Sequence, residues 1–121
     1  MPFPSLAGRG PITFQAKTAA YTIKDSENGT GFTNTGAAAV VTLTLPAAEV
    51  GMHYYFVVDD TDGIRIDPNG TETISLPSTG VPGAAGKYLT ADAIGESVHL
   101  ICAKAGTWAV LGFTGSWTAE A

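Results

Sequence analysis

Apolar and polar residues alternate with a period of two along much of the chain, the pattern of strands with one buried face. Residues 40–45 place a valine and two leucines on one face and two threonines on the other. Residues 54–58 are aromatic or β-branched, which suits a pleated, half-buried surface. Residues 64–66 alternate again before Asp-Pro-Asn-Gly at 67–70 turns the chain. These segments predict three strands in the middle of the sequence.

Further strands are predicted on the same grounds at residues 12–16, 21–23, 73–76, 98–103 and 108–113. Residues 87–94 fit either a strand or one helical turn. Pro46–Val50 is the one expected helical turn, because proline is favoured at the first helical position. The spacing of about one strand per ten residues is typical of sandwiches and barrels.

No repeat of fixed period is evident, which argues against a solenoid or a propeller. The sequence therefore predicts an all-β fold, a compact antiparallel sandwich or barrel of short strands with a jelly-roll-like arrangement. Residues 1–15 differ from the rest, since the first eleven contain three prolines and two glycines. That composition disfavours both a helix and a central strand. We expect residues 1–15 to form an extended arm and residues 16–121 to form a single all-β domain.

Charge and cysteine content narrow the class of protein. Charged residues make up 14% of the 121 residues and the formal net charge is -5, against a usual charged fraction of about a quarter. The acidic balance disfavours nucleic-acid binding. The low charge fits either faces covered by partners or an ordinary hydroxyl-rich sandwich. Cys102 is the only cysteine and is expected to be a buried free thiol.

No apolar run has the length of a membrane span, and the first residues lack the apolar core of a signal peptide. We therefore expect assembly in a reducing cytoplasm and no membrane partner. Asp59–Gly63 matches a calcium loop poorly, because an EF-hand alignment puts Val58 and Asn69 at the first and last ligand positions. An acidic turn is expected there, and a calcium site of another type that includes Asp67 remains the alternative.

Catalytic and cofactor motifs are weak. His53 and His99 have no partner at a metal-binding spacing, so a zinc-type site is not expected. No nucleophile elbow is present. Paired carboxylates assembled in space would be the route to a small hydrolase. We expect no enzyme activity, no catalytic residue, no metal and no cofactor.

The aromatic residues leave two alternatives open. They could stack on sugar rings as an exposed platform, or they could pack in the core and at subunit interfaces. The residues concerned are Tyr54, Tyr55, Tyr88, Trp108 and Trp117.

Five segments form a distinctive combination: FTNTGA at 32–37, TLTLPAA at 42–48, YFVV at 55–58, IDPNG at 66–70 and AGTWAV at 105–110. Together they resemble small structural modules of tailed bacteriophages. Such modules occur as head decoration (cement) or head-fibre proteins, and within tail-fibre proteins. The likeness extends over about residues 20 to 118.

The resemblance implies a homotrimer on the outer surface of the virion head, bound to the major capsid protein and stabilising the shell without catalysis. Tail fibres normally carry long shaft segments and this chain has a short arm, so decoration is favoured. The alternative is a tail-fibre or receptor-binding module that recognises host-surface glycans. The capsid-contact candidates are Phe3, Leu6, Arg9, Ile12 and Phe14. The subunit-interface candidates are Tyr54, Phe56, Tyr88, Trp108 and Trp117.

Overall fold

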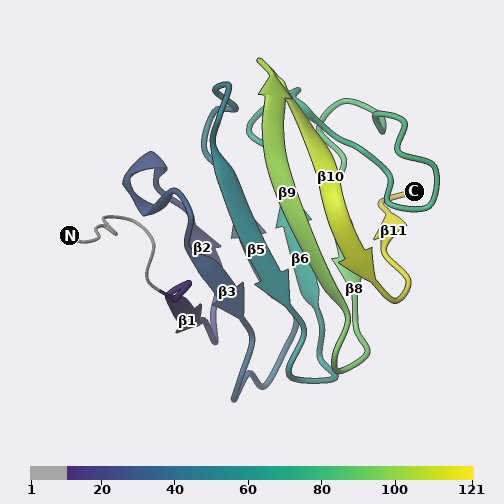
Figure 1. Cartoon of the computed structure of the whole chain (residues 1–121). Coiled ribbons are helices and arrows are strands. Elements are labelled where there is room, and N and C mark those ends of the chain that lie inside the picture. Colours follow the sequence, from purple (N-terminus) through teal and green to yellow (C-terminus); the bar gives the residue numbers. More distant parts are fainter. Residues whose placement is uncertain (1–10) are drawn as a thin grey trace.

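Two β-sheets packed face to face make up the protein (Figure 1). The computed structural model describes residues 11–121. Strands account for 41% of these residues, and no α-helix occurs among them. The predicted all-β sandwich is therefore confirmed. The described residues also contain no helix that is long and apolar enough to cross a lipid bilayer.

The first sheet, sheet A, has six strands, and β5, β9 and β10 lie in front in Figure 1. In spatial order its strands are β1 (Phe14–Ala16), β3 (Gly31–Thr33), β5 (His53–Val57), β9 (Ser97–Lys104), β10 (Thr107–Thr114) and β7 (Thr73–Ile74). Sheet B lies behind. Its strands are β11 (Thr118–Ala119), β8 (Leu89–Ala91), β6 (Ile64–Asp67), β4 (Val41–Thr44) and β2 (Tyr21–Thr22). A short 3-10 helix, η1 (Asp25–Glu27), precedes β3.

The first six strands alternate between the sheets, which makes the pairing mixed and not wholly antiparallel as expected. Strands β1, β3 and β5 run parallel in sheet A, and β2, β4 and β6 run parallel in sheet B. Each connection crosses to the opposite sheet, so successive strands of one sheet point the same way. Alternation in the sequence predicts which face of a strand is buried, but it does not predict the direction of the neighbouring strand. Strands β8 to β11 then add antiparallel pairs.

The core lies between the sheets. Its large, fully buried side chains include Phe32, Tyr54, Phe56, Leu100 and Trp108 from sheet A and Leu43, Ile64, Ile66 and Leu89 from sheet B. Cys102 is buried and free, as expected. The Tyr54 hydroxyl donates a hydrogen bond to the Lys24 carbonyl at 2.9 Å. Burial, with the nearby acids Asp25 and Glu27, raises the pKa of Tyr54 to about 12.

Two local expectations are resolved by the structure. The ambiguous segment 87–94 contains strand β8. The helical turn expected at Pro46–Val50 is wrong, because distant partners take the backbone donors of this region. The Ala48 N–H donates to Glu72 Oε1 at 2.9 Å, and the Gly51 N–H donates to the Cys102 carbonyl at 2.8 Å.

Candidate functional site

The outer face of sheet A carries almost no charge. The strands of this sheet contain one charged residue, Lys104 at the end of β9. Along β5 and β9, half-buried residues alternate with the buried core residues and therefore point outward. In β10, the residues that pair with outward residues of β9 lie on the same face. We call these outward residues the uncharged face: His53, Tyr55, Val57, Ser97, His99, Ile101, Ala109, Gly112 and Thr114.

Sheet B differs on its outer face. Arg65 and Asp67 of β6 alternate with the buried isoleucines and so point outward. The Arg65 guanidinium lies 4.8 Å from the centre of the Tyr88 ring. Burial, together with the charge of Glu120, raises the pKa of Asp67. The two faces of the sandwich therefore offer different chemistry to a partner.

Strand β10 leaves one edge of sheet A open. β7 pairs with Thr107 and Trp108 only, and no other strand of residues 11–121 pairs with that side of β10. Leu111 is 60% exposed and Phe113 is 46% exposed on this stretch. We call residues 109–114 the open edge. The remaining edge strands have two or three residues, as is usual for strands that must not pair with another chain.

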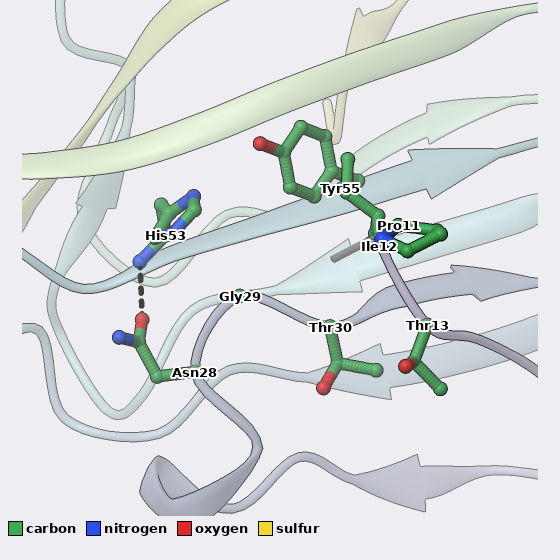
Figure 2. Close-up of a pocket in the computed structure, with 8 residues that line it drawn as sticks. All are labelled: Pro11, Ile12, Thr13, Asn28, Gly29, Thr30, His53 and Tyr55. Atoms are coloured by element: carbon green, nitrogen blue, oxygen red, sulfur yellow. Dashed lines mark hydrogen bonds between the residues drawn. The ribbon is translucent and has the colours of Figure 1, made fainter. Parts of the chain in front are cut away.

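A pocket lies where the parallel strands β1, β3 and β5 begin (Figure 2). Its volume is about 370 Å³, within the range of ligand pockets. None of the lining side chains is an acid, a lysine or an arginine. The lining consists of Pro11, Ile12, Thr13, Asn28, Gly29, Thr30, His53 and Tyr55.

Hydrogen bonds between the three strands fix the walls of this pocket. The His53 N–H donates to Asn28 Oδ1 at 2.7 Å, shown by the dashed line in Figure 2. The Gly29 N–H donates in return to the His53 carbonyl at 2.8 Å. Gly29 has a φ of 84°, a left-handed conformation that suits glycine. A Cβ atom at Gly29 would lie 3.6 Å from His53 Nε2, so the glycine leaves room on that side of the nitrogen.

The two histidines of the chain meet beside the pocket. His53 Nδ1 lies 3.0 Å from His99 Nε2, a hydrogen-bond distance. The Tyr55 ring stacks on His99 with 3.9 Å between ring centres and an interplanar angle of 18°. Tyr55 pairs directly with His99 and His53 with Ile101, which makes the two histidines diagonal neighbours. Burial, and secondarily the charge of His53, lowers the pKa of His99.

The expected capsid contacts are only partly described. Phe3, Leu6 and Arg9 lie outside the described residues. Ile12 is 43% exposed and Phe14 is 44% exposed. Phe14 already belongs to β1, and its ring covers Gly31 on the outer side of sheet A.

Four of the five expected interface residues are wrong for that role, because they fill the space between the sheets. Tyr54, Phe56 and Trp108 are fully buried, and Trp117 is 7% exposed. Tyr88 is half-buried beside Arg65 on sheet B. The aromatic platform is not formed either, since Tyr55 lies on sheet A and Tyr88 lies next to β8 of sheet B.

The open edge and most of the pocket lining are not predicted from the sequence. Alternation counted from the buried Trp108 places Leu111 on the outer face, but it does not show that β7 pairs with Thr107 and Trp108 only and leaves this side of β10 open. The Asn28-Gly29 pair is a strong turn signal, but the sequence does not reveal that the turn closes on β5.

The acidic turn at Asp59–Asp62 is held by hydrogen bonds within the protein. The Thr35 hydroxyl donates to Asp59 Oδ2 at 2.7 Å, and the Asp62 N–H donates to Asp60 Oδ1 at 3.0 Å. Across residues 11–121, no three His, Cys, Asp or Glu side chains are grouped so as to hold a metal ion.

Comparison with known proteins gives no match, either to a protein-family model or to a curated protein.

Proposed function

We propose that the protein is a structural subunit of a bacteriophage virion, a capsid decoration (cement) or head-fibre protein that binds the outer surface of the head and stabilises the shell. The sequence resemblance supports the class. The open edge of β10 is the structural observation that carries the proposal, because an unpaired strand edge can pair with another chain. Neither the resemblance nor the open edge implies a catalytic role.

An unpaired strand edge presents a row of backbone N–H and C=O groups that can pair with another chain. On the open edge, Leu111 and Phe113 add exposed apolar side chains, and residues 109–114 include no charge. Depletion of charge and the presence of aromatic side chains are features of interface cores. The occupant that we propose is another copy of the chain, since the resemblance implies a homotrimer. A contact between this edge and a different surface of the next copy can close into a three-membered ring.

Contact with the major capsid protein is assigned to residues 1–15. Within this segment, the structure describes two exposed large apolar side chains, Ile12 and Phe14. A subunit that binds the assembled shell, and not the free capsid protein, stabilises the shell by mass action. Repetition of the same contact over a shell multiplies this effect.

Deletion of residues 1–10 tests the capsid contact, because all the described strands remain. Purified heads of the parent phage are sedimented with the full-length or the shortened protein. We expect the full-length protein to sediment with the heads and the shortened protein to stay in the supernatant. Retained binding of the shortened protein would count against the arm. Absence of the full-length protein from heads, and from purified virions by mass spectrometry, would refute the proposed function.

Substitution Leu111→Lys tests self-association through the open edge. The matched control is Ile94→Lys, because Ile94 is 62% exposed but lies outside the strands. Light scattering at micromolar concentration should give a trimer for the wild type and for Ile94→Lys, and a monomer for Leu111→Lys. Circular dichroism should show the same strand content in all three. A trimer that tolerates Leu111→Lys would show that another surface joins the subunits.

A further inference from the structure

Asparagine followed by glycine occurs twice in the chain, as Asn28-Gly29 and Asn69-Gly70, and threonine follows both pairs. In such a pair the backbone nitrogen of the glycine can attack the asparagine side chain, because glycine has no Cβ to obstruct the approach. The reaction requires that this nitrogen and the side-chain amide are not held by other groups. Since the two pairs share the residues that follow them, the structure around each pair decides which one reacts.

The Asn69-Gly70 pair is exposed, in the turn that joins β6 to β7. The Asn69 carbonyl accepts a hydrogen bond from the Glu72 N–H at 3.0 Å, which places Gly70 and Thr71 at the two central positions of a β-turn. Within residues 11–121, no hydrogen bond engages the Asn69 side chain or the Gly70 N–H. Apart from its chain neighbours, no described atom lies within 4 Å of the position of a Cβ at Gly70, so the backbone has room to rotate.

The Asn28-Gly29 pair is held by two hydrogen bonds to β5, on the segment shown in Figure 2. Asn28 Oδ1 accepts from the His53 N–H at 2.7 Å, and the Gly29 N–H donates to the His53 carbonyl at 2.8 Å. Both bonds must open before the Gly29 nitrogen can attack the Asn28 side chain. One neutral hydrogen bond corresponds to about a fivefold effect on such an opening, so two bonds predict a reaction about thirtyfold slower than at an unconstrained pair.

We propose that Asn69 is a site of spontaneous deamidation and that the fold protects Asn28 from the same reaction. The Gly70 nitrogen attacks Asn69 Cγ, the new C–N bond closes a succinimide ring, and the side-chain amide leaves as ammonia with the proton of the Gly70 N–H. Water, the only co-reactant, then opens the ring at one of its two carbonyls. Opening at Cγ gives aspartate, whereas opening at the main-chain carbonyl gives isoaspartate. Both products add a negative charge, and isoaspartate adds one carbon to the main chain, in the turn that leads into β7 beside the open edge.

Incubation of the full-length protein at mildly alkaline pH, followed by peptide mapping with mass spectrometry, measures both asparagines in one sample. Deamidation replaces the side-chain NH2 by OH and so raises the mass of the peptide, and a protein-isoaspartate methyltransferase labels the isoaspartate product. In the native protein, Asn69 should be converted about thirtyfold faster than Asn28. In denaturing guanidinium chloride the two should be converted at similar rates, because the residues that follow them are the same.

Substitution Asn69→Gln removes the proposed site, because glutamine must close a larger ring and does so more slowly. Isoelectric focusing of the incubated native protein should show acidic species in the wild type and in the matched control Asn28→Gln, and almost none in Asn69→Gln. The inference is overturned if Asn28 is converted as fast as Asn69 in the native protein, if native Asn69 stays unmodified while the denatured sample is converted, or if the acidic species persist in Asn69→Gln. Neither phage heads nor self-association enters these measurements, so the result is independent of the proposed function.

Discussion

Asn34 holds the acidic turn to the sandwich, and its replacement gives the sharpest test of the fold. The side chain is fully buried. Its Nδ2 donates to the carbonyls of Asp60 at 2.9 Å and Gly63 at 3.2 Å, and its Oδ1 accepts from the Asp59 N–H at 2.7 Å. Three hydrogen bonds at about 1 kcal/mol each predict that Asn34→Ala lowers the free energy of unfolding by about 3 kcal/mol.

Substitution Asn34→Asp keeps the shape and tests the direction of these bonds. The new carboxylate can still accept a hydrogen bond from the Asp59 N–H. Its other oxygen, however, faces the two carbonyl oxygens to which the Nδ2 of Asn34 donates in the wild type. The folded state should therefore raise the pKa of the new carboxyl above its unfolded value of about 3.9. A raised pKa means that the variant is least impaired below about pH 4 and loses stability as the pH rises through the folded-state pKa.

Urea unfolding followed by circular dichroism measures both variants at pH 7 and at pH 3.5. Thr35→Ala is the control, because it removes an exposed hydrogen bond from the neighbouring residue to Asp59, and we expect a loss below about 1 kcal/mol. An unchanged slope against urea is required for the comparison. The reasoning fails if Asn34→Ala loses no more stability than Thr35→Ala, or if the Asn34→Asp penalty shrinks as the pH rises.

Three further predictions follow from single contacts. In urea unfolding, Gly63→Ala should lower the free energy of unfolding by at least about 1 kcal/mol more than the control Gly80→Ala does. Both glycines have a positive φ, but only at Gly63 would a Cβ lie 2.9 Å from the Ala91 carbonyl. Equal losses of stability in the two variants would exclude this clash. The backbone N–H groups of Ser116, Ala93 and Asp92 hold the pKa of Glu96 below its usual range, so its contribution to stability should be present above about pH 4.3 and lost as the pH falls through the folded-state pKa. Glu96→Gln should flatten the acid limb of the stability profile, and an unchanged profile would contradict this. An NMR titration should give a His99 pKa below 6.5, because burial and, secondarily, the charge of His53 lower it. Stability should therefore decrease as the pH falls from about 6.5 through the folded-state pKa of His99. His53→Gln should raise the His99 pKa, and a lowered pKa would refute the role given to His53.

The strands were predictable where side chains alternate strongly. Residues 40–45 and 54–58 become β4 and β5 with shifts of one residue at the boundaries. The pairing of strands was not predictable, because a period of two carries no information on neighbours. The short β8 was ambiguous, since its three residues are too few for a pattern.

The functional surfaces were harder to predict because they combine residues distant in the sequence. His53 and His99 are separated by 46 positions and meet only through the β5–β9 register. The large aromatic residues were assigned to an interface, but a small sandwich needs such side chains for its own core. The open edge around Leu111 depends on where the pairing of β7 with β10 ends, and the sequence does not show which strands pair.

The alternation of the first strands between the sheets has a mechanical consequence. β1 and β2 are the outermost strands of sheets A and B at the same side of the sandwich, and both belong to the amino-terminal end of the chain. A force applied at that end would remove one strand from each layer in turn and expose the next pair unchanged. In such stepwise unfolding, β1 and β2 separate first while the remaining strands of both sheets stay packed together.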